Sequence, residues 1–159
     1  MAVTAARHLS PSLSPAELRA WHALLRAHAA LVRALDAELE AAHGLPLSSY
    51  GVLVELAEAP GQRMRMCDLA TTALLSRSGL TRLVDRLERD GLLERVACAT
   101  DARGAFARLT PAGHERLRAA RATHAAVVHE RFGGRFHEGD LALLGDLLGR
   151  VDAPGGRCC

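Results

Sequence analysis

The sequence contains no lysine, no isoleucine and no asparagine, and aromatic residues make up only 3% of its 159 positions. All twenty basic side chains are therefore arginine, and leucine, alanine and valine must supply most of the core. No apolar run approaches the roughly 18 residues that a membrane-spanning helix requires. Residues 1–13 also lack the apolar block of a secretion signal. These absences predict a cytoplasmic protein that makes no contact with a membrane.

The four cysteines have no spacing typical of a disulfide framework, and the motifs of common enzymes are missing. Cys158 and Cys159 are adjacent at one end, and Cys67 and Cys98 form no CxxC motif, so a disulfide framework is not expected. The sequence has no GxSxG, P-loop, GxGxxG or HExxH pattern. We therefore predict that the chain is not an enzyme and holds neither a cofactor nor a metal.

The basic side chains gather in the middle of the sequence. Residues 63–108 contain nine arginines and six acidic residues, whereas residues 15–43 contain three arginines and four acidic residues. The whole chain has a net charge of only +2. This uneven distribution is compatible with a nucleic-acid partner but does not by itself establish one.

A long first helix is expected near the N-terminus. It begins at Pro15, where Ser14 and Glu17 have the spacing of a capping box, and it ends at His43 because Gly44 follows. Its length of about 40 Å is too great for complete burial in a domain of this size. We therefore expect a second copy of the chain to cover part of this helix.

Cap and turn residues predict five further helices and one β-hairpin. Ser48 is expected to cap the second helix, which ends at Pro60 and Gly61. The other helices are expected at residues 67–72, 76–90, 111–132 and 138–150, and the strands at 92–96 and 104–109, with a polar turn between them. The last helix is expected to bury Leu141, Leu144, Leu147 and Leu148.

This order predicts a mainly α fold with a winged helix-turn-helix at its centre. The short third helix and the fourth helix form the helix-turn-helix, and the hairpin forms the wing. The expected parts are a flexible N-terminal arm (1–13), an N-terminal dimerisation helix (14–46), a DNA-binding region (47–110), C-terminal dimerisation helices (111–153) and a flexible tail (154–159).

The fourth helix has an apolar face and a face suited to DNA. Its outward side chains combine arginines, which can pair with guanine in the major groove, with small hydroxyls that suit phosphates or bases. Gly79 keeps the first turn slim, and the helix N-terminus at Ser76 favours a phosphate. The residues expected to face DNA from this helix are Ser76, Arg77, Ser78, Gly79, Thr81, Arg82 and Arg86.

The wing supplies a second group of candidate DNA contacts. Arg103 lies near its tip, where it can enter a narrow minor groove, and Asp101 is placed to orient it. Arg95 and Arg108 on the strands are expected to reach flanking phosphates. The alternative for each residue alone is an ordinary solvated surface charge, but the combination of helix-turn-helix, wing and flanking helices is more specific.

Residues 75–95 (LSRSGLTRLVDRLERDGLLER) resemble the recognition helix and first wing strand of the MarR (multiple antibiotic resistance regulator) family. Residues 101–104 (DARG) and 109–113 (LTPAG) resemble the wing of that family and the start of the helix after it. The resemblance implies an intertwined homodimer that binds double-stranded DNA at a palindromic operator and acts as a repressor. It also implies roles for Thr81 and Arg82 in the major groove and for Arg103 in the minor groove.

The resemblance further implies a small-molecule effector that releases DNA from a cleft between the dimerisation and DNA-binding parts. The candidate cleft residues are Trp21, His28 and Tyr50. Trp21 also fits the apolar stripe of the first helix, so core packing is the alternative. The acid that follows the aromatic residue in urate-responsive members is replaced by Gly51, which speaks against urate.

Three alternatives to an effector-controlled DNA regulator follow from the same residues. A winged-helix protein–protein adaptor would use the same fold without binding DNA. A metal-responsive regulator would draw ligands from the eight histidines, although His124 and His129 are five residues apart, which is unsuited to a helical pair of ligands. A redox-responsive regulator would use Cys98 on the wing.

Overall fold

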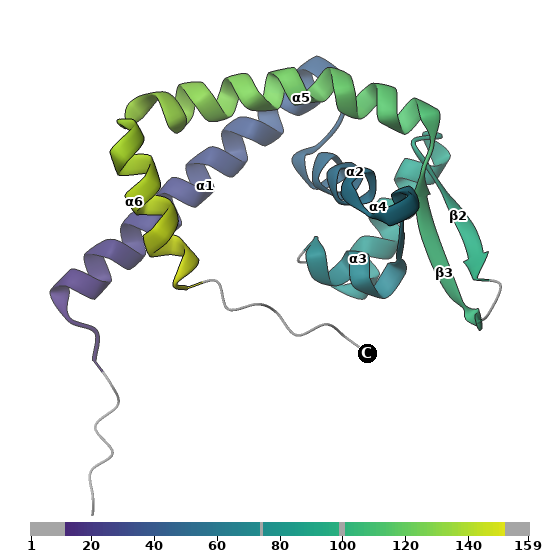
Figure 1. The fold of residues 1–159 in the computed structure, drawn as a ribbon, viewed down its shortest axis with the longest axis horizontal. Helices are drawn as coiled ribbons and strands as arrows, with labels where there is room; N and C mark the ends of the chain where they lie inside the picture. The colour runs from purple at the N-terminus through teal and green to yellow at the C-terminus, as the bar shows by residue number, and fades with distance from the viewer. Residues whose placement is uncertain (1–11, 74, 99–100, 152–159) are drawn as a thin grey trace, which may run out of the picture.

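A computed structural model of the chain describes residues 12–73, 75–98 and 101–151, with only the backbone described at Cys98 and at 101–104 (Figure 1). The expected arm, tail and terminal cysteine pair therefore lie largely or wholly outside the described residues. The elements follow the order α1 (Pro15–His43), α2 (Leu47–Glu58), η1 (Pro60–Gln62), β1 (Arg63–Arg65), α3 (Met66–Thr72), α4 (Arg77–Arg89), β2 (Leu93–Cys98), β3 (Asp101–Leu109), α5 (Pro111–Arg131), η2 (Gly133–Arg135) and α6 (Glu138–Gly149).

Helix α1 has the predicted limits, and local hydrogen bonds explain both. At its start the Ser14 hydroxyl accepts from the Glu17 N–H at 3.2 Å, and the Glu17 carboxylate accepts from the Ser14 N–H at 2.7 Å. At its end Gly44 takes a left-handed conformation with φ 57°, which glycine adopts without strain. The capping box and the glycine stop read from the sequence are both confirmed.

The start of α2 differs from the prediction. Ser48 does not cap this helix, which begins at Leu47 with Pro46 in the capping position and no side-chain cap from its own segment. Asp36 of α1 instead accepts a 2.8 Å hydrogen bond from the Leu47 N–H. A cap supplied by another helix depends on tertiary packing, so the local sequence around Ser48 could not reveal it.

The hairpin is longer than predicted and gains a third strand. In the antiparallel order β1-β3-β2, β1 lies against β3 with Met64 opposite Ala107, and β2 lies against β3 with Val96 opposite Phe106. The sequence predicts no strand over residues 63–65, because three residues are too few to show a strand period. Pairing with β3 is what makes this segment a strand.

The core lies where α2, α3, α4 and α5 meet the base of the sheet. Its fully buried side chains include Leu53, Leu56, Leu69, Val84 and Leu93. Gly113 at the start of α5 packs closely against the wing base, since a Cβ atom there would lie 2.0 Å from the Leu92 carbonyl oxygen. The core therefore fixes the position of the wing base relative to α4 and α5.

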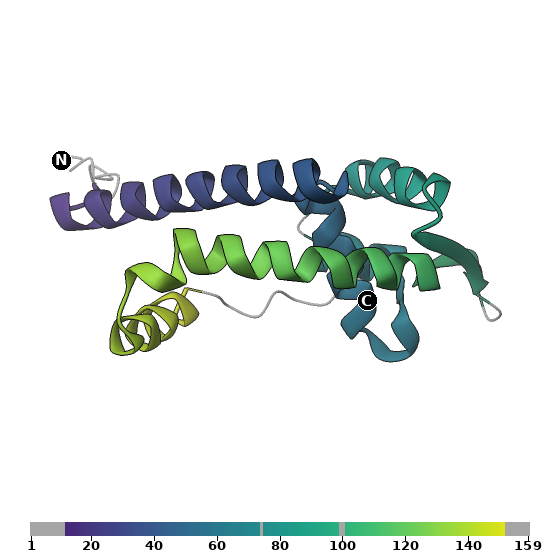
Figure 2. The same cartoon turned by 90° about the horizontal axis from the view of Figure 1, so that it is seen from above.

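The predicted burial of α6 is wrong for a single chain. Leu147 and Leu148 are 44% and 41% exposed, and Leu141 and Leu144 are only partly buried. Figure 2 shows the reason, because α6 lies beside the C-terminal end of α5, on the side that faces away from α1. The N-terminal half of α1 is also uncovered, with Trp21 51% exposed. These two apolar surfaces lie at the opposite end of the molecule from the wing (Figure 1).

Candidate nucleic-acid interface

Helix α4 is amphipathic in the way its sequence predicts. Leu80, Leu83, Val84 and Leu87 are buried in the core. The Ser76 hydroxyl caps the helix by accepting from the Gly79 N–H at 3.1 Å. A methyl group at Gly79 would come within 3.0 Å of that hydroxyl, so the glycine leaves room for the cap. The burial of one face thus determines which side chains α4 presents to solvent.

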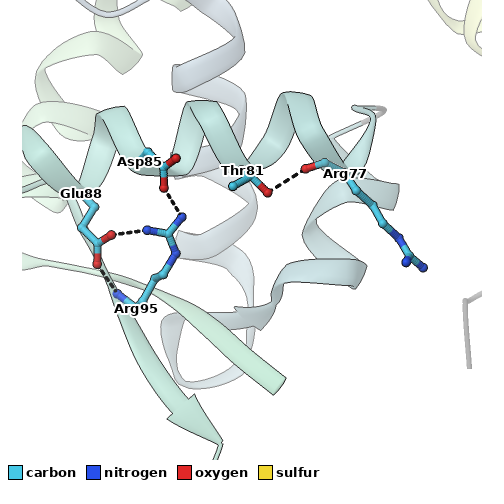
Figure 3. Close-up of polar contacts among 5 residues, drawn as sticks. All are labelled: Arg77, Thr81, Asp85, Glu88 and Arg95. Carbon is cyan, nitrogen blue, oxygen red and sulfur yellow. Dashed lines mark hydrogen bonds and ion pairs between the residues drawn. The ribbon is translucent and has the colours of Figure 1, made fainter. Parts of the chain in front are cut away.

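The first two turns of α4 expose four of the predicted side chains, Arg77, Ser78, Thr81 and Arg82. Within the described residues, neither Arg77 nor Arg82 forms an ion pair. The Thr81 hydroxyl donates to the Arg77 carbonyl at 2.9 Å (Figure 3). Its hydrogen is therefore used within the helix, and Thr81 offers an acceptor oxygen and a methyl group to a partner.

Arg86 does not join this group. Its guanidinium group donates to the hydroxyl of Ser49 on α2 at 2.7 Å. The side chain is thereby directed toward α2 and the body of the domain. Although Arg86 was predicted to contact DNA, its observed hydrogen bond is one that fastens α4 to α2.

Arg95 on β2 is held by two acidic side chains of α4 (Figure 3). One guanidinium nitrogen lies 2.5 Å from Asp85 Oδ1, and another pairs with Glu88. Burial lowers the pKa of Arg95, but hydrogen bonds and charge interactions with Asp85 and Glu88 outweigh it, and the pKa is raised overall. The phosphate contact predicted for Arg95 would have to compete with both carboxylates.

The other predicted wing residues are placed as follows. Arg108 on β3 pairs with Glu94 on β2 at 2.7 Å, so its charge is also used between strands. Asp101 lies opposite Cys98 in the sheet, and Arg103 follows on the same strand. The side chains of Asp101 and Arg103 are outside the described part, so their predicted roles remain predictions.

The partners of the three arginines 86, 95 and 108 were not predicted from the sequence. The sequence does contain a signal for the Arg95 contacts. Asp85 and Glu88 are three residues apart near the end of a predicted helix, and Arg95 follows on the next predicted strand. The contact between Arg86 and Ser49 left no such signal, because the two residues are 37 positions apart.

The three effector-cleft candidates are not gathered into one cavity. Trp21 and His28 are exposed on α1, whereas Tyr50 on α2 is 7% exposed. Tyr50 stacks on His124 of α5, with ring centroids 4.7 Å apart and planes inclined by 17°. Burial raises the pKa of Tyr50 and lowers that of His124. The observed aromatic partner of Tyr50 is therefore a histidine that the sequence analysis did not connect with it.

Two surface hollows lie elsewhere on the chain. One, of about 470 Å³, lies beside β1, where Arg63 and Arg65 flank the Phe106 ring at 5.3 and 5.6 Å from its centroid. The other, of about 350 Å³, lies beside Ser49, Arg86 and Arg116. Neither contains Trp21, His28 or Tyr50. Across the described ranges, no three histidine, cysteine, aspartate or glutamate residues are grouped to hold a metal, and no helix is long and apolar enough to cross a membrane.

The exposed recognition helix and the adjacent hairpin define a winged helix-turn-helix protein, and comparison with known proteins identifies the family. A model of the MarR family matches residues 43–104. Sco3205, a MarR family transcriptional regulator from Streptomyces coelicolor solved in complex with DNA, is 35% identical, with 91% of this chain and 90% of that chain covered and a TM-score of 0.84. AbsC, a MarR family transcriptional regulator from the same organism, is also 35% identical, with 89% and 95% covered and a TM-score of 0.82.

A mutant of MarR from Escherichia coli complexed with operator DNA shares the fold, at 20% identity, 90% and 100% coverage and a TM-score of 0.77. No curated protein matches the chain. The chain belongs to the MarR family. The predicted family, the mainly α winged fold and the function of a DNA-binding transcription regulator are thereby confirmed. Regulators of this family act as dimers.

Proposed function

We propose that a homodimer of this chain binds an inverted-repeat operator and represses transcription from it. The recognition helix α4 of each protomer enters a major groove, and each wing reaches the adjoining minor groove. The observation that carries this proposal is the exposed first half of α4, where Arg77, Ser78, Thr81 and Arg82 face solvent beside a buried leucine face.

The exposed apolar surfaces of α1 and α6 support the dimer. Leu18, Trp21 and Leu25 on α1 and Leu147 and Leu148 on α6 are each at least 39% exposed in the single chain. Large exposed apolar patches commonly mark protein interfaces. Since these surfaces lie far from the wing (Figure 1), pairing through them leaves the two wings at the outer ends of the dimer.

The side chains of α4 suit direct reading of bases. A guanidinium group can donate two hydrogen bonds to guanine, and Arg82 is placed for this role one turn into the helix. The free acceptor and methyl group of Thr81 suit a base amino group or the methyl group of thymine. Ser78 and the amino end of α4 suit a phosphate. Arg103, oriented by Asp101, supplies the minor-groove contact.

An aromatic effector would have to compete with the Tyr50–His124 stack. A related fold, BpsR from Bordetella bronchiseptica, has its DNA binding regulated by 6-hydroxynicotinic acid. Of the three candidate contacts, Trp21 and His28 lie exposed on α1 and share no cavity with Tyr50 in the single chain, so we limit the proposed effector contact to Tyr50. Because His124 already covers Tyr50, an effector that uses the tyrosine ring displaces the histidine. The protein performs no catalysis in this scheme, and it acts in the cytoplasm, where its DNA target lies.

Selection of bound sequences from a random duplex pool tests the proposal. Purified protein near physiological salt should enrich a palindrome whose half-sites lie about 10 base pairs apart. Analytical ultracentrifugation of the same sample should show a dimer. A pool that stays random, with only weak and strongly salt-dependent binding, would contradict the operator proposal and favour the protein–protein adaptor.

A further inference from the structure

Arg95 connects the wing to the recognition helix at three points (Figure 3). Its guanidinium group contacts both Asp85 and Glu88, which are three residues apart and share one side of α4. Its backbone N–H also donates to Glu88 Oε1 at 3.1 Å. A single residue of β2 is thus held by α4 through its backbone and its side chain together.

These contacts lie where they can control the direction of the wing. The chain leaves α4 through a tight turn at Gly91, where φ is 71°, and the buried Leu92 and Leu93 fix the base of the hairpin. Arg95 contacts α4 two residues beyond this base, and Val96 and Ala97 continue toward the tip. A small rotation at Arg95 would be amplified at the end of the wing.

Resting on the proposed function, we propose that Arg95 is a positioning residue that determines DNA specificity through the angle between α4 and the wing. Its pairs with Asp85 and Glu88 hold the recognition helix and the wing in one fixed relation. The base pairs contacted by α4 in the major groove and by the wing in the minor groove then keep a constant spacing. Arg95 in this role need not contact DNA.

The same pairs also shield DNA from two negative charges. Asp85 is exposed on α4, one turn after Thr81 and three residues after Arg82. An unpaired carboxylate there would repel the phosphate backbone. Replacing Arg95 would therefore combine a loosened wing with new repulsion, so a clean test must remove the carboxylate charges and keep the arginine.

The double variant Asp85→Asn/Glu88→Gln meets this requirement, because amides keep the size of the side chains and lose their charge. Fluorescence anisotropy compares the selected operator with two altered duplexes, one changed at a flanking base pair next to the wing and one changed under α4. We expect discrimination at the flanking pair to fall about tenfold and discrimination under α4 to stay within about twofold of the wild-type value.

Glu94→Gln is the matched control. It removes an ion pair of the same kind from the neighbouring residue, but the pair joins β2 to β3 and does not reach α4. Its flanking discrimination should equal that of the wild type. Asp85→Asn alone retains both Glu88 contacts, should show a smaller loss, and serves if the double variant fails to fold by circular dichroism.

Undiminished flanking discrimination in the double variant would overturn the inference. The two lost negative charges are expected to tighten binding to every duplex, so the ratio of affinities for the selected and the flanking-altered duplex is the deciding measurement. Undiminished discrimination leaves the proposed function standing, since the wild type is still selective. If the wild type itself selects no sequence, the proposed function fails and the inference fails with it.

Discussion

The Arg86 guanidinium group on the recognition helix donates a 2.7 Å hydrogen bond to the hydroxyl of Ser49, which is completely buried on α2. The arginine is itself exposed over much of its length, so it links a buried hydroxyl to the surface of α4. This bond ties the position of the recognition helix to the helix that packs beneath it. It also distinguishes Arg86 from Arg82, whose guanidinium group forms neither a hydrogen bond nor an ion pair within the described residues.

Replacing Arg86 with methionine should lower stability and change the salt dependence of DNA binding little, because its guanidinium group is directed toward Ser49 on α2. The substitution keeps the length of the side chain but leaves the Ser49 hydroxyl without its partner, at a cost of about 1–3 kcal/mol in the free energy of unfolding. Urea denaturation at a fixed dimer concentration measures this cost. Adding Ser49→Ala to Arg86→Met should recover part of it. Unchanged stability together with a salt slope reduced by about one for each protomer would instead make Arg86 a phosphate contact.

Arg82→Ala should weaken operator binding by about 1–3 kcal/mol for each half-site and relax the preference at one base pair in each half-site. The reason is that an exposed arginine without an ion pair in the second turn of α4 is placed to pair with a base edge. Anisotropy titrations against the selected operator and single-base variants measure both effects. Arg118→Ala on α5, which removes a surface ion pair with Glu115, is the control and should bind as the wild type does. Retained discrimination in Arg82→Ala would remove the residue from the reading face.

The sequence predicts those structural features that depend on residues close together along the chain. The Ser14 and Glu17 capping box, the Ser76 cap and the leucine face of α4 all follow from local spacing, and all are present. The exposure of Arg77, Thr81 and Arg82 follows from the same helical period. These features define the fold and the solvent-facing side of the recognition helix.

The remaining features depend on partners distant in sequence. Asp36 caps α2 from another helix, and Ser49 holds Arg86 across 37 residues. Sequence reasoning treats every arginine near a recognition helix as available to DNA, but Arg95 and Arg108 have intramolecular ion pairs. The exposure of Leu147 has a similar explanation. The leucine spacing of α6 indicates an apolar face, but it does not show whether the surface that covers this face belongs to the same chain.

Gly113→Ala should destabilise the protein where α5 begins. The new Cβ would lie 2.0 Å from the Leu92 carbonyl oxygen and 2.7 Å from a Leu109 methyl carbon, so the start of α5 must move away from the wing base. We expect a loss of about 1–3 kcal/mol by urea denaturation. Gly51→Ala is the matched control, since no atom lies within 4 Å of its Cβ and alanine favours the helix by up to about 1 kcal/mol. If the two variants are equally stable, the start of α5 can move away from the Leu92 carbonyl oxygen without a measurable loss of stability.

Lowering the pH should destabilise the fold through His124. Burial against Tyr50 lowers the pKa of His124 below 6.5, so the folded state binds its proton less readily than the unfolded state does. The contribution of neutral His124 to the free energy of unfolding is therefore fully present above about pH 6.5. It is lost as the pH falls below 6.5 and passes the lower pKa of the folded state. Urea denaturation at a series of pH values between 7.5 and 5, as a rough working range for histidine titration, measures the loss.

His124→Phe keeps a ring for the stack on Tyr50 and removes the proton-binding site, so its stability should fall less than that of the wild type over this range. If His124→Phe loses stability as steeply as the wild type, another group dominates the acid response. In that case burial of the His124 ring against Tyr50 has no measurable effect on proton uptake during unfolding.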